Sequence, residues 1–400
     1  MNLKNKRVFV SGAAGVIGIQ LVNLLQKEGC IIFAADKKDK PQEFSKNIFY
    51  RQGDLNFIKK YEIESYSCSI FFHLAATFER TSENFSFYED NFKNNICLSN
   101  KLVKFFSETS YIKKIIFASS YLIYDKSIYL KNISSAPTKL DEKTIRDTRN
   151  LVGTAKYLHE KEIEFLNKFS KQKKFYNVRI FRGYGLGSRD IISRWVRLAL
   201  QNKKINLYNP DSSFDFIFCK DSAEGLLRIA KSNLRSQVIN LGFGKSKKIN
   251  DVIDILKSFF KNLKIKKLKS DKLIEKSFSG NKIIKKLKWK PMYKIKQGIK
   301  LIIRYEKDLY KKNLTKKSKK TQKRKILLTC FGPKKIPLLK HINFAVNRVE
   351  SNLEVLVGNS KDNNILRELC GKIFLMPKIE NYDYKNLLKI FKKNNIKTVI

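Results

Sequence analysis

The N-terminal part of the chain alternates short apolar runs with longer stretches in which apolar residues recur at helical spacing. Residues 6–11 form the first apolar run, and residues 15–28 follow with apolar side chains every three or four positions. Further apolar runs occupy residues 31–35, 68–75, 115–119 and 176–181. Such runs predict buried strands, and the 3.6-residue spacing predicts helices between them. Alternating strands and helices predict an α/β protein with a parallel, doubly wound sheet.

The pattern changes along the chain and predicts more than one domain. Residues 182–300 are less regular, with Gly/Pro turns and short helical segments, and indicate a smaller substrate-binding lobe that completes a domain over residues 1–310. Residues 311–325 are almost devoid of apolar side chains and predict a basic linker. A fresh apolar strand opens a second α/β domain over residues 326–400. The chain stops inside an apolar run, so we expect this second domain to be truncated.

Composition narrows the class of protein. The chain is 42% hydrophobic, and it contains no apolar run of about 18 residues that would span a membrane. Its N-terminus has no signal-peptide core, so we expect a cytoplasmic protein. The six cysteines are scattered without a CxxC pair, and the three histidines lie far apart. We therefore expect reduced thiols and no metal site.

The net charge of +47 is concentrated in one part of the chain. Residues 245–325 hold 30 basic and 6 acidic residues. Such an excess attracts nucleic acid, anionic lipid or acidic substrates. No recognisable nucleic-acid motif accompanies it, so both a solvated basic surface and an anionic partner stay open.

A glycine-rich turn between the first strand and the first helix predicts a dinucleotide site of the Rossmann type. Gly12 allows a tight turn, Gly15 allows backbone to approach a pyrophosphate, and Gly18 allows close helix–strand packing. The helix N-terminus then offers N–H groups to the phosphates. Asp36 ends the second strand, where an acidic side chain binds ribose hydroxyls and repels a 2′-phosphate, which favours NAD over NADP. Lys37 and Lys38 follow and weaken that preference.

Two further segments make the resemblance specific. Gly53-Asp54-Leu55 and Phe72-His73-Leu74-Ala75-Ala76, with the GxxGxxG spacing, resemble the extended short-chain dehydrogenase/reductase family, which includes nucleotide-sugar 4-epimerases, dehydratases and reductases. Asn95 resembles the asparagine of that family's NVxGT segment, although Leu98 and Ser99 replace its Gly-Thr. The resemblance implies a cofactor site that includes Gly12, Ala14, Gly15, Val16, Ile17, Gly18, Asp36, Asp54, Leu55, Leu74, Ala75, Ala76, Asn95, Ser119, Tyr157 and Lys161.

Three residues form the predicted catalytic set. Ser120 ends a strand, and Tyr157 and Lys161 are spaced i, i+4, so they share one helix face. Tyrosine has a pKa near ~10, and a nearby ammonium stabilises its phenolate, so Tyr157 can act as the base for a sugar hydroxyl. Lys161 would also hold the nicotinamide ribose, and Ser120 would hydrogen-bond the reacting oxygen. The resemblance assigns the same roles to these positions.

The residues after Ser120 bear on the reaction. Family dehydratases carry an acidic pair there, whereas this chain has Tyr121 and Leu122, which argues against dehydration. We expect 4-epimerisation of a nucleotide-activated sugar through a transient ketosugar. Asp125 resembles a position in deoxysugar reductases, so a ketosugar reductase stays open. A non-catalytic dinucleotide-binding scaffold is the alternative of another class.

The substrate half resembles the family less well. Arg182 and Tyr184 lie in a segment like R-x-x-N-x-Y-G, with Arg182 in place of Asn. Asp215 lies in a segment like R-D-F-I, with Phe214 in place of Arg. The resemblance implies substrate contacts for Arg182, Tyr184 and Asp215, and a homodimer formed through the helix that carries Tyr157.

The C-terminal segment carries a different resemblance. Residues 325–332 and 374–378 together resemble the N-terminal subdomain of ATP-grasp ligases such as carbamoyl-phosphate synthase-like proteins. The ATP-binding lobes are absent from the sequence given, so we expect no ligase activity from residues 326–400.

Overall fold

The computed structural model forms two units. It describes residues 1–78, 85–170, 172–268, 271–318, 324–328, 353–359, 373–375, 391–392 and 396–399. One unit spans Met1–Lys307 and the other spans Asp308–Ile400. Among the described residues, no helix is long and apolar enough to cross a membrane.

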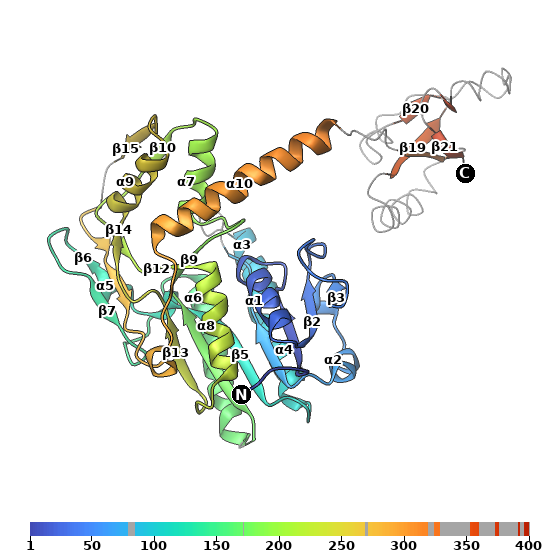
Figure 1. Ribbon diagram of the computed structural model, residues 1–400. Helices are drawn as coiled ribbons and strands as arrows, with labels where there is room; N and C mark the ends of the chain where they lie inside the picture. The colour runs from blue at the N-terminus through green and yellow to red at the C-terminus, as the bar shows by residue number, and fades with distance from the viewer. Residues whose placement is uncertain are drawn as a thin grey trace. The chain divides into compact units, whose positions relative to one another are not determined.

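A seven-stranded sheet organises the first unit (Figure 1). Its order is β13-β8-β5-β4-β1-β2-β3, and every neighbouring pair is parallel. The predicted doubly wound α/β fold is therefore confirmed. The strands are β1 (Arg7–Ser11), β2 (Ile31–Asp36), β3 (Phe49–Gln52), β4 (Ile70–His73), β5 (Lys114–Ser120), β8 (Lys174–Ile180) and β13 (Gln237–Leu241).

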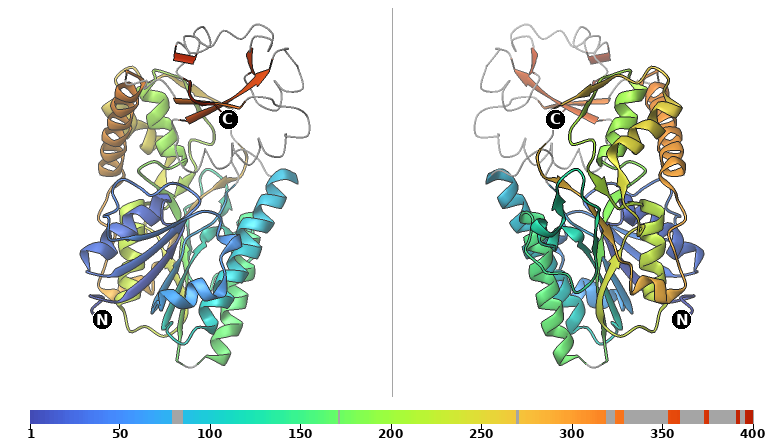
Figure 2. Two further views of the ribbon diagram at one scale, coloured as in Figure 1. Left: turned by 90° about the vertical axis from the view of Figure 1, so that its right-hand side faces the viewer. Right: turned by 90° about the vertical axis from the view of Figure 1, so that its left-hand side faces the viewer.

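Helices cover both faces of this sheet, as the views of Figure 2 show. On one face, α1 (Val16–Lys27) packs beside α8 (Cys219–Lys231) over an aliphatic core that includes Val10, Leu21 and Leu226. On the other face, α2 (Lys60–Tyr66), α4 (Leu98–Glu108) and α6 (Leu151–Phe169) cover a core richer in phenylalanine. The same face carries α3 (Phe85–Asn91), the π-helix η2 (Phe92–Cys97) and the 3₁₀ turn η1 (Leu55–Phe57).

A smaller lobe follows β8 and has its own core around Trp195 and Phe218. It contains α7 (Ile191–Leu200), α9 (Ile249–Phe259) and the parallel pairs β9 (Arg182–Tyr184) with β12 (Phe216–Phe218) and β10 (Ile205–Leu207) with β15 (Ile265–Lys267). Short elements complete the unit: η3 (Tyr121–Ile123), α5 (Lys126–Tyr129), β6 (Leu130–Lys131), β7 (Thr138–Leu140), β11 (Ser213–Phe214), β14 (Lys247–Lys248), β16 (Ile274–Glu275), β17 (Ser277–Ser279) and η4 (Ile284–Leu287).

The second unit contains a four-stranded parallel sheet of order β20-β19-β18-β21. Its strands are β18 (Arg324–Leu328), β19 (Leu353–Asn359), β20 (Ile373–Leu375) and β21 (Ile396–Val399). The helix before it, α10, spans Ile295–Ser318, so the first residues of the expected linker 311–325 are helical. Lysine is a good helix former, which explains why the charged stretch extends the helix.

Candidate active site

The predicted phosphate loop lies between β1 and α1. Gly12 has a φ of +72°, and a Cβ there would lie 2.7 Å from the backbone nitrogen of Ala75. A Cβ on Gly18 would lie 2.2 Å from the carbonyl oxygen of Gly12. Gly15 caps α1 without a side-chain hydrogen bond, so the N–H groups of its first turn are free for an anion. The loop therefore fits a dinucleotide pyrophosphate, and the partly exposed side chains of Val16 and Ile17 border it.

Asp36 connects the second strand to this loop. Its Oδ2 accepts the N–H of Ala14 at 3.0 Å, and its Oδ1 accepts the N–H of Lys38 at 3.1 Å. Each oxygen keeps a further lone pair for a ribose hydroxyl. Lys37 turns away from Asp36, because its Nζ lies 3.3 Å from Asp54 and 2.7 Å from Asn94 Oδ1. The Lys37 charge that was expected to weaken the NAD preference is thus partly balanced.

Asp54 is held by its neighbours. Burial raises its pKa, but hydrogen bonds from the N–H and side chain of Asn56, together with Lys37, outweigh this and lower it. The carboxylate therefore stays ionised and keeps η1 in place, with its Oδ1 accepting the N–H of Asn56 at 2.9 Å. Leu55, also predicted near the cofactor, is buried in the core beneath α4.

The loop after β4 is held by buried polar groups. His73 lies between Ser11 and Ser99, with its Nδ1 2.7 Å from Ser11 Oγ and its Nε2 2.8 Å from Ser99 Oγ. Burial lowers its pKa well below the usual range, so the ring is neutral. Leu74, Ala75 and Ala76 follow with partly exposed side chains at the edge of the glycine turn.

Asn95 holds this loop from η2. Its Oδ1 accepts the Thr77 N–H at 2.7 Å, and its Nδ2 donates to the Thr77 carbonyl at 2.9 Å and to Asn91 Oδ1 at 2.7 Å. With three hydrogen bonds to its amide, Asn95 positions the loop through Thr77. The π-helical turn that carries it is a feature often found at functional sites.

Ser119 and Ser120 end β5 at the same edge of the sheet. Ser119 Oγ donates to Glu160 Oε1 at 2.5 Å, and the Oγ of Ser120 accepts the Leu122 N–H at 3.2 Å. The hydroxyl proton of Ser120 is therefore free to point at a ligand. The first turn of α6 packs directly against η3, since a Cβ on Gly153 would lie 2.6 Å from the Leu122 carbonyl oxygen.

Tyr157 and Lys161 share a face of α6, as their spacing predicted. Lys161 Nζ lies 5.8 Å from the centre of the Tyr157 ring. This face is turned towards solvent, because the Lys161 side chain is 46% exposed and forms an ion pair with Glu164 at 2.9 Å. Tyr157 as base and Lys161 as ligand of the nicotinamide ribose stay predictions, and Lys161 itself points into solvent in this structure.

Lys156, which the sequence analysis did not single out, is the α6 lysine that faces the sheet. It is 3% exposed, and its Nζ lies 4.6 Å from the centre of the Phe117 ring in β5. The residue one turn earlier is Val152, which is fully buried. Five residues rotate a helix by about 500°, which is about 140° beyond a full turn, so Lys156 and Lys161 cannot face the same neighbour.

A buried ion pair fixes α6 to the sheet below the site. Glu160 Oε2 accepts from Arg179 Nη2 at 2.6 Å, and Glu160 Oε1 accepts from Arg179 Nε at 3.0 Å and from Ser119. Arg179 Nη1 also donates to Tyr124 OH at 3.0 Å. These residues join α6, β8 and β5 behind Ser120.

Arg182 lies in a second cluster of polar side chains, next to Tyr121 of η3 and Glu275 of β16. Its Nε donates to Tyr121 OH at 3.3 Å, its guanidinium lies 4.0 Å from the centre of the Phe214 ring, and its Nη2 lies 3.8 Å from Glu275. Arg149 forms a direct ion pair with the same Glu275. Two guanidinium groups around one carboxylate leave a net positive charge beside Ser120 and Tyr121.

Tyr184 and Asp215, whose predicted contact with substrate stays a prediction, lie in the interior of the lobe. Tyr184 is 1% exposed and packs on Phe216 and Phe218. Asp215 is equally buried, and its carboxylate accepts backbone N–H groups from Phe243, Gly244 and Ser279 at 2.6 to 2.9 Å. Both residues stabilise the lobe, and a short sequence motif does not distinguish that role from ligand contact.

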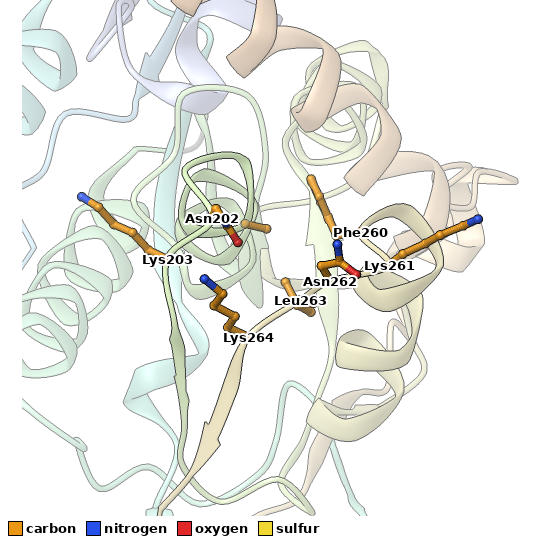
Figure 3. Close-up of a pocket in the computed structure, with 8 residues that line it drawn as sticks. Asn202, Lys203, Phe260, Lys261, Asn262, Leu263 and Lys264 are labelled. Atoms are coloured by element: carbon orange, nitrogen blue, oxygen red, sulfur yellow. The ribbon is translucent and has the colours of Figure 1, made fainter.

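A hollow of about 300 Å³ lies elsewhere, between the C-terminal ends of α7 and α9 (Figure 3). Lys203, Lys261 and Lys264 line it with Phe260 and Leu263. Lys203 and Lys261 extend away from it in opposite directions. None of the predicted site residues lines this hollow, so it is separate from the edge of the sheet described above.

The glycine turn, the acidic end of β2 and the serine at the end of β5 together define a Rossmann-type dinucleotide-binding protein with an appended lobe. The chain belongs to the NAD dependent epimerase/dehydratase family, whose model matches residues 8–242.

Curated relatives are similar in sequence, and a solved structure shares the fold. A UDP-glucuronate 4-epimerase of Thermodesulfobacterium geofontis is 26% identical over 75% of this chain and 95% of that protein. A putative UDP-glucose 4-epimerase of Methanocaldococcus jannaschii is 25% identical, over 49% of this chain and 64% of that protein, slightly less than two thirds of its length. MoeE5 in complex with UDP-glucuronic acid and NAD has a TM-score of 0.66 at 21% identity, covering 76% of this chain and 99% of that chain.

Proposed function

We propose that the first unit catalyses NAD-dependent 4-epimerisation of a nucleotide-activated sugar. The observation that carries this proposal is the free N-terminus of α1, with Gly12 and Asp36 beside it, at the same sheet edge as Ser120. The 4-epimerase relative that aligns over 95% of its length supports the reaction, and MoeE5, whose complex holds UDP-glucuronic acid and NAD, supports the ligands. Bound NAD supplies a hydride acceptor that can return the hydride to the other face of the sugar carbon.

The residues of the chain have separable roles in this proposal. The first turn of α1 binds the pyrophosphate, and Asp36 accepts hydrogen bonds from the adenosine ribose. Ser120 donates its hydroxyl proton to the reacting sugar oxygen. Arg182 and Arg149 hold the anionic part of the substrate, since they outnumber the single carboxylate of Glu275. Tyr121 and Leu122 supply no carboxylic acid next to Ser120, which favours epimerisation over loss of water.

The test begins with cofactor content. The purified full chain is denatured, released dinucleotide is identified by mass spectrometry, and the native protein is offered UDP-, dTDP- and GDP-sugars, with isomers separated by chromatography. We expect released NAD and interconversion of two isomers without net NADH consumption. Protein that neither contains nor binds NAD refutes the proposal, and net NADH consumption with a ketosugar assigns the alternative reductase.

One observation favours a non-catalytic dinucleotide-binding scaffold. The buried lysine of α6, Lys156, has the aliphatic Val152 four residues before it, where a catalytic tyrosine would be needed. The reductase alternative gains no comparable support, because the Asp125 side chain caps α5 by accepting the Ser127 N–H at 2.8 Å. Bound NAD without turnover of any offered sugar assigns the scaffold.

We also propose that the protein forms a homodimer through α3, η2 and α6. These adjoining elements expose large apolar side chains: Phe85, Tyr88, Phe92, Leu158, Phe165 and Phe169. Covering such a surface with a second copy buries apolar area that a monomer leaves in water. Light scattering measures the mass in solution, and a monomer at micromolar concentration refutes this proposal.

For the second unit we keep the proposed likeness to the N-terminal subdomain of ATP-grasp ligases. Its four parallel strands are compatible with that likeness. Most residues of the two motifs, in 325–332 and 374–378, lie outside the described residues. An assay of ADP release with carboxylate and amine substrates tests this likeness.

A further inference from the structure

The register of α6 decides which lysine reaches the reaction site. The buried face of the helix carries Val152, Gly153, Lys156 and Glu160, and it lies against β5 and η3. Phe117, under Lys156, and Leu122, against Gly153, bracket Ser120 in the sequence. The ammonium of Lys156 therefore lies beside the stretch that presents the Ser120 hydroxyl.

No described residue satisfies this ammonium. Among the described residues, Lys156 Nζ contacts the aromatic ring of Phe117 and forms no hydrogen bond or ion pair. The other polar groups around it are already paired: His73 with two serines, Glu160 with Arg179, and His159 with Glu162 and the Asn95 carbonyl. A buried cation without an acceptor is costly, so it indicates a ligand or a proton-transfer role.

No phenol precedes Lys156 at the spacing of the family's tyrosine–lysine pair. The family pattern places a tyrosine four residues before its lysine, and four residues before Lys156 stands Val152. Tyr121 is the phenol next to Ser120 in the sequence, but burial raises its pKa despite the opposing effect of Arg182. A buried phenol of raised pKa is a poor base at neutral pH.

We propose that the amine of Lys156 takes over the role of base in this chain and accepts the proton of the reacting sugar hydroxyl. This inference rests on the proposed function. As the carbon–hydrogen bond of the sugar breaks, its electron pair leaves with the hydrogen to NAD, and the O–H proton passes to the Nζ lone pair. The ketosugar forms, and return of the hydride and the proton restores the alcohol and the neutral amine.

The titration of Lys156 is compatible with this role. Burial lowers its pKa to about 8. The Lys156 charge acts on His73 of β4, and Glu160 lies one turn further along the same buried face of α6. His73 is neutral, and Arg179 and Glu160 offset each other. At pH 7 about a tenth of the Lys156 side chain is then the free amine, against well below ~1% for an ordinary lysine.

The experiment compares Lys156→Arg and Lys156→Gln with wild-type full chain, using Lys168→Arg on the exposed side of α6 as the matched control. Arginine keeps the positive charge but does not give up its proton near neutral pH. Each variant is assayed for isomer turnover and for NAD binding by calorimetry, and circular dichroism verifies folding. We expect K156R to bind NAD within about tenfold of wild type and to lose at least about 100-fold in kcat, the usual contribution of acid–base catalysis. K168R is expected to keep wild-type kcat.

A second measurement does not depend on turnover. The rate at which an amine-specific acylating reagent labels Lys156 in the folded protein is followed by mass spectrometry from pH 6 to 11. We expect a midpoint near 8, as the structure implies, and a midpoint above 10 overturns the inference. A K156R enzyme that keeps at least a third of wild-type kcat also overturns the inference. So does a result in which Tyr157→Phe loses turnover while both Lys156 variants keep full activity. Wild type that binds NAD but converts no sugar refutes the proposed function, and the inference falls with it.

Discussion

Replacing Glu160 with glutamine should destabilise the first unit more than any exposed acidic substitution on the same helix. The Arg179 guanidinium is completely buried, and Glu160 supplies its counter-charge through both carboxylate oxygens. Glu160→Gln keeps the shape of the side chain and removes its charge, which leaves a buried cation unpaired. Breaking a buried pair in this way costs about 3–5 kcal/mol. For a unit of this size that lowers Tm by roughly 5–8 °C.

The same helix provides the matched control. Glu164 lies one turn further on and pairs with Lys161 in solvent, with 58% of its side chain exposed. Glu164→Gln should change the free energy of unfolding by less than about 1 kcal/mol. Both tryptophans, Trp195 and Trp289, lie in the first unit, so fluorescence during urea unfolding follows that unit alone.

A double substitution separates the charge effect from simple loss of packing. Removing both partners, in E160M/R179M, should restore a large part of the stability lost in E160M, because no unpaired charge remains. Equal losses for E160Q and E164Q, or a double variant whose loss is the sum of the two single losses, would refute the electrostatic argument.

Four further predictions test the site. Gly18→Ala should abolish NAD binding measured by calorimetry, because the added Cβ would lie 2.2 Å from the Gly12 carbonyl oxygen and must move the phosphate loop. Asp36→Asn should weaken NAD binding and raise the ratio of NADP affinity to NAD affinity at least about tenfold. The reason is that removing the carboxylate leaves the Lys38 ammonium near a 2′-phosphate. An unchanged ratio contradicts this prediction. Asn95→Ala should raise the Kd for NAD and accelerate amide exchange in residues 74–78, since the two hydrogen bonds to Thr77 are lost. Lys156→Met should stabilise the ligand-free protein at neutral pH. Because burial lowers the pKa of Lys156 in the folded protein to about 8, wild type loses up to about 3 kcal/mol of stability as the pH falls from about 10 to 8. Urea unfolding at pH 7.5 and 9.5 should therefore show a smaller pH dependence in K156M than in wild type.

The fold of the first unit was predictable because each element carries its own local signal. The runs at residues 6–11 and 31–35 became β1 and β2, and the helical spacing from Val16 to Leu25 became α1. The glycine turn between them was equally legible, since Gly12 and Gly18 are dictated by close backbone contacts. Where charge replaced apolar periodicity, after residue 310, the boundary of α10 was missed.

The face of α6 was not predictable from the tyrosine–lysine spacing alone. Tyr157 and Lys161 satisfy that spacing, yet the apolar positions Val152, Ala155 and Ile163 set the phase of the helix. That phase turns Lys156 inward and Lys161 outward. The hydrophobic pattern of residues 152–163 therefore predicts which face of α6 is buried, and the tyrosine–lysine spacing alone does not.

The glycine turn of the first unit follows the family pattern, whereas the sheet-facing side of α6 does not. Asp36 and Asn95 use hydrogen bonds to hold the loops beside the glycine turn. On α6, Val152 stands four residues before Lys156, which is buried without an acceptor among the described residues. An unpaired ammonium lowers the stability of the ligand-free protein, and ligand hydroxyls are the groups that would relieve that cost. NAD should therefore raise the Tm of wild type more than that of K156M, because only wild type carries a cost that binding removes.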